Sequence, residues 1–138
     1  MAKHVLKNAD VVIDSVNLSD HISSVTLETS RPEVDVTAMG NSHQQFAAGL
    51  GDATITLEVF QDYAAASVDT TLWPKSNSDT AFNVVVKPTS NVVSATNPSF
   101  TMSSLLYEYS PLAGSVGDAN TTTVTFRNAG TGITRATA

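Results

Sequence analysis

The sequence contains no cysteine among its 138 residues. Disulfide bonds, thiolate metal ligands and a cysteine nucleophile are therefore excluded, together with the enzyme classes that depend on them. No run of 18 apolar residues occurs, so a membrane-spanning helix is not predicted. The basic start of the chain lacks the apolar run of a signal peptide. These absences predict a soluble protein, made and kept in a cytoplasm, with no membrane partner.

Charged residues are sparse, at 14%, whereas Ser and Thr together make up about a quarter of the chain. Hydroxyl side chains suit the solvated faces of β-strands better than the surfaces of helices. The length is about that of one domain, which would bury roughly 68% of the surface of its unfolded chain. We therefore expect a single all-β domain over residues 1–138, with a flexible C-terminal tail at 129–138.

The charges that do occur are mostly negative and unevenly placed. Thirteen acidic residues stand against seven basic ones, which gives a net charge of −6. Between residues 8 and 74 the only basic residue is Arg31, although ten of the acids lie there. Because binding to nucleic-acid phosphates requires positive charge, tight nucleic-acid binding is not expected.

Alternating apolar and polar residues predict a series of strands. In residues 22–30 the pair Ser23-Ser24 breaks the alternation, and a β-bulge there would restore it. In residues 99–110 both faces carry apolar side chains, which indicates cover on two sides or contact with another subunit. The expected strands are 4–7 and 11–14 as a first hairpin, 22–30, 33–39, 52–60, 80–88, 99–110 and 121–128.

One helix is expected, over residues 62–74. Asp62 is a suitable N-cap and Pro74 a suitable end. A stripe of apolar residues would pack on the sheet, and we expect Val68, Leu72 and Trp73 to be core residues of this helix.

No motif points to catalysis, metal binding or a cofactor. The three histidines have no second ligand at a suitable spacing, and "GLGD" lacks the lysine of a phosphate-binding loop. Acidic pairs such as Glu33/Asp35 and Glu58/Asp62 could resemble glycosidase carboxylates, but exposed strand faces explain them better. We expect no catalytic residue, no metal site and no cofactor, with His4, His21 and His43 as surface histidines.

Residues 40–51 form a glycine-rich apolar loop between two expected strands. Ser42 and Gln45 fit a capping box, which predicts one or two helical turns. Phe46 and Leu50 would lie on one side of these turns. Two interpretations stay open: the loop covers its own core, or it inserts into a neighbouring molecule.

This region resembles the tail tube proteins, or major tail proteins, of bacteriophages with long non-contractile tails. The matching features are Asp35-Val36-Thr37, Gly40, Gly49-Leu50, the alternating strand from Asp52 to Phe60, and the helix that follows. The resemblance implies an all-β fold with one short helix, a β-sandwich or partly closed barrel of the tail tube type. It further implies hexameric rings that stack into a tube, which conducts the DNA genome without binding it specifically.

The resemblance also assigns expected roles to residues. Acidic side chains on strands beside the loop would line the lumen, and loop residues would contact the next ring. The lumen candidates are Glu28, Glu33, Asp35 and Glu58; the inter-ring candidates are Gly40, His43, Phe46, Leu50 and Gly51. The implied partners are further copies of the chain and the tape measure, tail terminator and distal tail proteins of a virion tail assembled in a host cytoplasm.

Two alternatives remain. One is another β-rich virion protein, for tail completion or head decoration. The other is a carbohydrate-binding or adhesin-like β-sandwich, which requires an exposed aromatic platform. Tyr107 and Tyr109 are the candidate pair for such a platform.

Overall fold

The computed structural model describes residues 3–138. Strands dominate it, and the elements follow the chain in the order β1 (Asp10–Ile13), β2 (Val16–Asn17), a 3-10 turn η1 (Ser19–His21), β3 (Ile22–Ser30), β4 (Glu33–Asp35), β5 (Phe46–Ala48), β6 (Asp52–Phe60), α1 (Val68–Ser76), β7 (Phe82–Lys87), β8 (Ser99–Glu108), β9 (Thr121–Asn128) and β10 (Thr134–Ala136).

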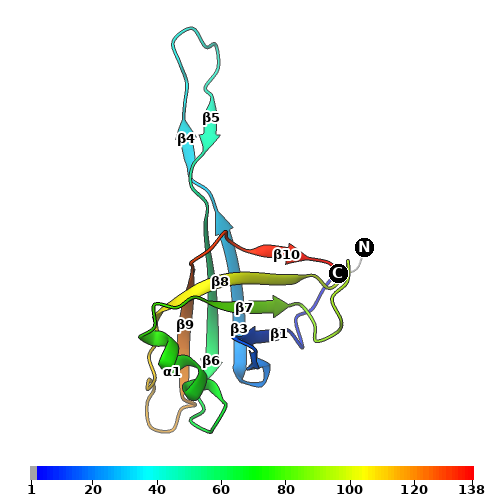
Figure 1. The fold of residues 1–138 in the computed structure, drawn as a ribbon, viewed down its shortest axis with the longest axis vertical. Coiled ribbons are helices and arrows are strands. Elements are labelled where there is room, and N and C mark those ends of the chain that lie inside the picture. The colour runs from blue at the N-terminus through cyan, green and yellow to red at the C-terminus, as the bar shows by residue number, and fades with distance from the viewer. Residues whose placement is uncertain (1–2) are drawn as a thin grey trace.

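The strands of the body form one antiparallel sheet that folds over on itself. Its order is β2-β1-β7-β8-β9-β6-β3, and β10 pairs with β8. In Figure 1 β3, β6 and β9 follow the long axis of the molecule, whereas β1, β7, β8 and β10 cross it. The sheet ends at β2 and β3, so it forms an open sandwich and not a closed barrel. The predicted all-β fold with one short helix is confirmed.

The core fills the space between the two crossing parts of the sheet. Its side chains come from alternate positions of the strands, as period-two burial requires. Phe82 and Phe126 meet edge to face, with ring centroids 5.7 Å apart. The buried apolar residues are Val11, Ile13, Leu18, Ala53, Ile55, Leu57, Val59, Val68, Leu72, Phe82, Val84, Val86, Met102, Leu106, Val124 and Phe126.

The longest predicted strands form where expected. β3 spans residues 22–30, and its register with β6 shifts between Ile22 and Ser24. The bulge predicted at Ser23-Ser24 is therefore confirmed. In β6 every second side chain from Ala53 to Val59 is buried.

The first hairpin differs from the prediction. β1 pairs with β2, which follows it in the chain, and residues 4–7 lie outside the sheet. Asp14 and Ser15 join the two strands with φ of 48° and 69°, the conformation of a type I′ turn. Asp and Ser lack the Asn-Gly signature of such turns, so the sequence pattern did not reveal this hairpin.

The helix also differs, because it starts later than predicted. It begins after Ser67, whose backbone N–H donates to the Thr70 hydroxyl at 2.9 Å. Asp62 lies outside the helix and its carboxylate accepts from the Ser67 hydroxyl at 2.7 Å. Pro74 lies inside the last turn and does not end the helix.

Two of the three expected core residues of this helix, Val68 and Leu72, are buried. Trp73 is 52% exposed, so the expectation that it is buried is wrong. The physical reason is the helical period: consecutive positions point about 100° apart, so with Val68 and Leu72 facing the sheet the position after Leu72 turns toward solvent.

The C-terminal residues 129–138, for which a flexible tail is expected, include the short strand β10. Residues 134–136 pair with Thr101, Phe100 and Ser99 of β8. The turn before them is held by Asn128, whose Oδ1 accepts from the backbone N–H groups of Gly130 and Gly132, each at 3.0 Å. Sequence composition did not reveal this pairing because its partner lies about 35 residues away, in β8.

Candidate functional site

A two-stranded arm projects from the body along the long axis of the molecule (Figure 1). It consists of β4, β5 and the turn between them, residues 33–48, as a continuation of the β3–β6 pair. Glu33 lies opposite Ala48, and Asp35 lies opposite Phe46. At the base of the arm the Gly49 N–H donates to the Pro32 carbonyl at 2.8 Å, which connects the arm to the body.

Hydrogen bonds of its own order the tip of the arm. The Val36 N–H donates to the Gln45 carbonyl at 2.9 Å, and the Gln45 N–H donates to the Thr37 hydroxyl at 2.8 Å. The Thr37 N–H donates to the Asp35 carboxylate at 2.9 Å. Hydrogen bonds from Thr37 hold the pKa of Asp35 below its usual value, because they stabilise the charged form.

The helical turns predicted for the loop do not form. Residues 46–48 are strand β5, and residues 36–45 form a loop that contains a turn, in which the Asn41 N–H donates to the Ala38 carbonyl at 3.2 Å. Gly40, at the turn, has φ of +91°, a conformation that favours glycine. The local capping-box signal is overridden because the chain continues the antiparallel β3–β6 pair into the β4–β5 pair.

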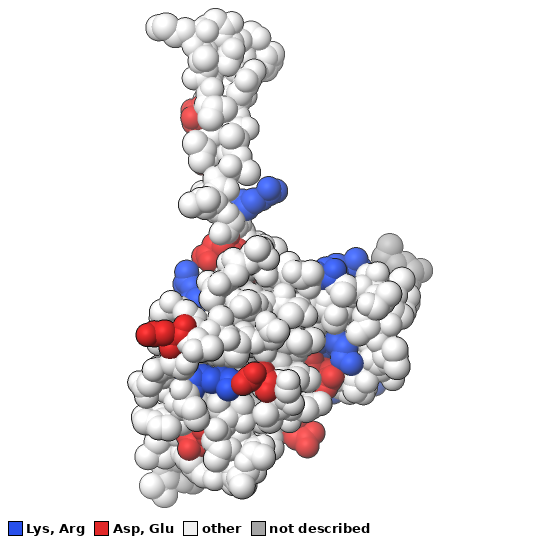
Figure 2. Space-filling view, viewed as in Figure 1, with Lys and Arg blue, Asp and Glu red and all other residues white. Residues whose placement is uncertain are grey.

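Apolar side chains of the arm are exposed to solvent and do not cover the core. Phe46 is 50% exposed, Leu50 is 90% exposed, and Met39 is fully exposed. Val34 and Val36 are exposed as well. Residues 36–51 include no Asp, Glu, Lys or Arg, and Figure 2 shows few charged side chains on the arm. The first interpretation of the loop, as a cover for its own core, is therefore wrong.

The inter-ring candidates from the sequence all lie on the arm or at its base. Gly40 and His43 are in the turn, Phe46 is in β5, and Leu50 and Gly51 lie between β5 and β6. Met39 and Gly49 also lie on the arm or at its base, although neither is among the inter-ring candidates. A Cβ at Gly49 would lie 2.6 Å from the Pro32 ring, whereas one at Gly51 would make ordinary contacts.

A second feature is the polar outer face of β3, β6 and β9. The side chains opposite the core are mainly hydroxyls, in rows such as Thr26, Thr56 and Thr125. Glu28 lies opposite Thr54, and Glu58 lies opposite Ser24 and Thr123. The side chains of this face have little apolar area, so the face is suited to water and not to a packed interface.

The four acidic candidates divide into two pairs. Glu28 and Glu58 lie on the polar outer face, while Glu33 and Asp35 lie on the arm. Sequence reasoning missed two further acids of the face, Asp52 and Glu108. Asp52 pairs with Arg127 at 3.3 Å, and Glu108 lies opposite Thr125 in β9. The alternation of β6 places Asp52 on the face of Glu58, whereas Glu108 is identified by its register with β9.

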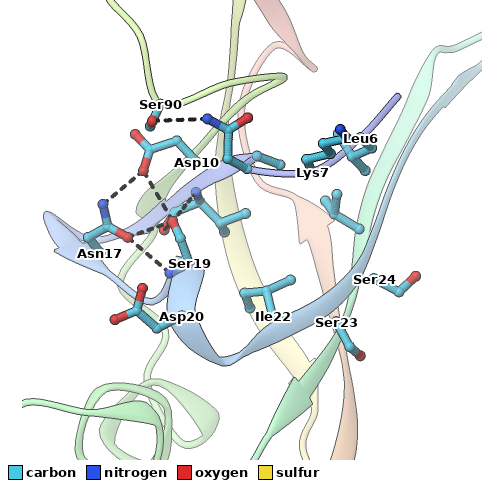
Figure 3. A pocket seen from close by; sticks show the side chains of 14 residues that line it. Leu6, Lys7, Asp10, Asn17, Ser19, Asp20, Ile22, Ser23, Ser24 and Ser90 are labelled. Carbon is cyan, nitrogen blue, oxygen red and sulfur yellow. Dashed lines mark hydrogen bonds between the residues drawn. The ribbon is translucent and has the colours of Figure 1, made fainter. Parts of the chain in front are cut away.

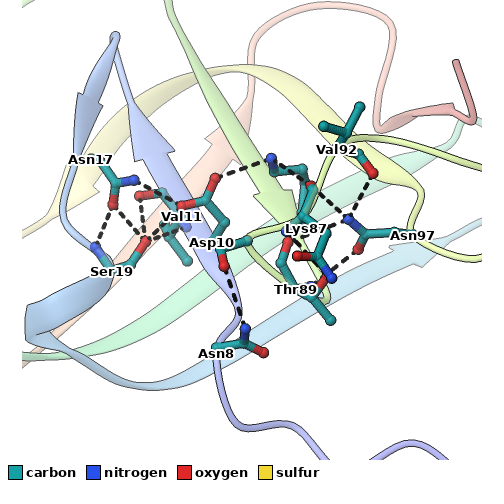
Figure 4. A network of polar contacts seen from close by, with 11 residues as sticks. Asn8, Asp10, Val11, Asn17, Ser19, Lys87, Thr89, Val92 and Asn97 are labelled. Carbon is teal, nitrogen blue, oxygen red and sulfur yellow. Dashed lines mark hydrogen bonds and ion pairs between the residues drawn. The ribbon is translucent and has the colours of Figure 1, made fainter.

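An open cavity of roughly 630 Å³ lies between the segment before β1 and the start of β3 (Figure 3). Asp10 is a partly buried acid of this cavity, and its carboxylate already has polar partners. It accepts from Asn17 Nδ2 at 2.8 Å and from the Ser19 hydroxyl at 3.1 Å, and it pairs with Lys87 at 3.3 Å (Figure 4). These contacts connect β1, β2 and β7, so the polar cluster explains the local fold.

Within residues 3–138 no group of three or more His, Asp or Glu side chains could hold a metal ion. His21 contacts Asp62 at 3.0 Å, while His4 and His43 lie on exposed segments. In the same part of the chain, no helix has the length and apolar character that crossing a membrane requires.

The aromatic platform of the carbohydrate-binding alternative does not form. Tyr107 is 71% exposed, but Tyr109 packs against the core. The Tyr109 hydroxyl donates to Asp69 at 2.8 Å and accepts from Gln61 at 2.9 Å. A bulge between Leu106 and Glu108 breaks the register there, so the two rings do not present one surface.

The Tyr109 environment predicts a pH dependence. Burial raises its pKa from 10.0 to about 12. A group whose pKa is higher in the folded state contributes stability at neutral pH that is lost as the pH rises. We expect the free energy of unfolding to fall between pH 10 and about 12, and to fall less in Tyr109→Phe. Denaturant unfolding at pH 8 and near pH 11 checks this, and equal losses in both proteins would contradict it.

The chain is similar to known proteins in its fold and not in its sequence. No protein-family model matches the chain, and no curated protein matches its sequence. A chain from the virion of a native gene transfer agent particle has a TM-score of 0.77 at 12% identity, covering 97% of this chain and 99% of that chain.

Two further structures agree with this result. A chain from the tail of an empty gene transfer agent particle, with C6 symmetry, has a TM-score of 0.66 at 13% identity, covering 86% and 82% of the two chains. A chain from the sheath-tube complex of an extracellular contractile injection system has a TM-score of 0.67 at 11% identity, covering 99% and 93%. The chain therefore shares its fold with proteins of phage-like tails and injection tubes, and the resemblance to tail tube proteins is confirmed at the level of the fold.

Proposed function

We propose that the chain is the structural subunit of a phage-like tail tube, that it forms stacked hexameric rings, and that it has no catalytic activity. The observation that carries this proposal is the arm. An ordered projection with several exposed apolar side chains, whose only charged side chains are Glu33 and Asp35 on β4, is a liability for a monomer, because such surface favours association. In a stacked tube the same side chains would be removed from water at every ring.

The open sheet supports association within a ring. Among the described residues β3 pairs with β6 on one edge, and its other edge has no strand partner. Neighbouring copies would pair at this edge, and a closed ring leaves no edge exposed to aggregation. The tail of the empty gene transfer agent particle has six-fold symmetry, and we extend it to this chain on the basis of the shared fold.

The polar outer face is our candidate for the lumen wall. Four carboxylates, those of Glu28, Asp52, Glu58 and Glu108, lie on it beside one guanidinium, that of Arg127. Each carboxylate repels a phosphate by about 1 kcal/mol at 4 Å in water, and salt screens this over roughly 8 Å. Repetition around every ring would sum these small terms, so that DNA passes through without being held.

The acids of the arm have a related role in this proposal. Glu33 and Asp35 extend from the body on β4, so they would lie in the lumen wall where two rings meet. The chain would act in a virion tail, with the tape measure, tail terminator and distal tail proteins as its partners. It would be made in the cytoplasm of the host cell.

Electron microscopy of the purified protein at increasing concentration tests the proposal. We expect hollow rings and stacked tubes with a six-fold end view. Solid filaments, or globular monomers at every concentration, would contradict it. A tail completion or decoration protein would give rings or monomers that do not stack.

The base of the arm offers a more local prediction. Gly49→Ala would place a Cβ 2.6 Å from the rigid Pro32 ring, so the arm must shift relative to the body. We expect slower and weaker assembly by light scattering, with an unchanged melting temperature of the body. Gly51→Ala is the matched control, since its Cβ would lie 3.6 Å from its nearest neighbour. Equal assembly of the two variants would show that the position of the arm does not affect assembly.

A further inference from the structure

A second group of exposed apolar side chains lies at the end of the molecule opposite the arm. We call it the base patch: Phe60, Tyr63, Leu112 and Val116. Leu112 is 80% exposed and Val116 is fully exposed, and about half of each aromatic side chain is exposed as well. Figure 1 shows the connection between β8 and β9, which carries Leu112 and Val116, at the far end of the long axis from the arm.

The loop that carries the base patch is held in place at both ends. The Tyr63 hydroxyl donates to the Pro111 carbonyl at 2.6 Å and accepts from Asn120 Nδ2 at 3.1 Å. Gln61 donates from its side chain to the Pro111 carbonyl at 2.8 Å and from its backbone to the Asn120 carbonyl at the same distance. The body therefore fixes the two ends of a loop whose apolar side chains point away from the core.

The arm and the base patch match in charge. Residues 36–51, which form the tip of the arm, β5 and the base after it, and residues 109–117 of the loop include no Asp, Glu, Lys or Arg. The nearest acid of the arm is Asp35, opposite Phe46, so a contact made by residues 36–51 alone would bury no ion. Apolar surface of this kind on a soluble protein indicates an interaction site, and the two sites belong to one chain.

From these observations we propose that the arm tip of one copy binds the base patch of the next copy along the tube. This inference rests on the proposed tube function and names the surface that receives the arm. Because the two surfaces differ and lie at opposite ends, the contact is head to tail and does not close on itself. Every ring would then present free arms at one end and free base patches at the other, so stacking has no fixed limit.

The lack of native cysteine allows a direct test by cross-linking. Gln45→Cys places a thiol beside Phe46 without removing an arm contact, and Ser115→Cys places one beside Val116. The matched control is Val92→Cys, at an exposed position in the connection between β7 and β8. Single-cysteine proteins are mixed, assembled, and treated with a short bismaleimide.

We expect covalent dimers from Gln45→Cys with Ser115→Cys, and their loss when Phe46→Asp is added to the first protein. Dimers that form as readily with Val92→Cys, or only between two arms, in protein that still forms tubes would overturn the inference and leave the tube function intact. Absence of rings and tubes for the unmodified protein would instead remove the proposed function, and this inference with it.

Discussion

Phe46→Asp is expected to give a folded protein that no longer assembles into tubes. Phe46 is half exposed on the arm and lies outside the buried core, so the body loses no packing contact. In an assembled tube the ring would be buried against the next copy. Burial of a Phe side chain contributes roughly 1.5 to 3 kcal/mol, and an unpaired carboxylate there adds a desolvation cost. A loss of about 1.4 kcal/mol already weakens one contact tenfold, and each ring repeats the contact.

The measurement is electron microscopy and light scattering, with circular dichroism and thermal unfolding as tests of folding. The new aspartate would face Asp35 across the β4–β5 pair, and this repulsion could loosen the arm by itself. Phe46→Asn separates the two effects, because it removes the apolar ring without adding charge. We expect Phe46→Asn to assemble more weakly than the unmodified protein and Phe46→Asp not to assemble. A Phe46→Asp protein that forms normal tubes would show that the arm does not make the contact between rings.

Glu28→Lys combined with Glu58→Lys is expected to convert the tube from one that releases DNA into one that retains it. Both side chains lie on the polar outer face, which we assign to the lumen. The two reversals change the net charge of the chain from −6 to −2. In a hexameric ring they would place new lysines along the whole wall. Each phosphate contact contributes about 0.9 to the logarithmic salt slope of binding, so retention should fall steeply as salt rises.

The readout is the amount of a short DNA duplex that co-sediments with assembled tubes at low and at high salt. The control is Asp20→Lys combined with Asp79→Lys, which gives the same net charge from residues on η1 and between α1 and β7. We expect strong, salt-sensitive retention for the first pair and little for the second. Equal retention by both pairs would place Glu28 and Glu58 on the outside of the tube.

The arm and the polar face differ in how far the sequence predicts them. Phe46 and Leu50 stood out because apolar residues between glycines are unusual in a loop, and the structure places both in solvent. The orientation of the arm could not be predicted, since it follows from the way β5 continues β6 alongside β4. The place of Glu108 on the face depends on its pairing with β9 after the bulge at Leu106, whereas the alternation of β6 already places Asp52 on the same face as Glu58.

The sequence by itself determined the strands whose faces differ in polarity. In β6 the alternation from Ala53 to Val59 specifies which side is buried, and the Ser23-Ser24 break specifies a bulge, because side chains in a strand alternate with period two. Tertiary structure alone decided the partner of β1, the start of α1 after Ser67, the exposure of Trp73 and the strand at residues 134–136. In each of these cases the free energy depends on which distant segment lies alongside, and local pattern carries no information about that neighbour.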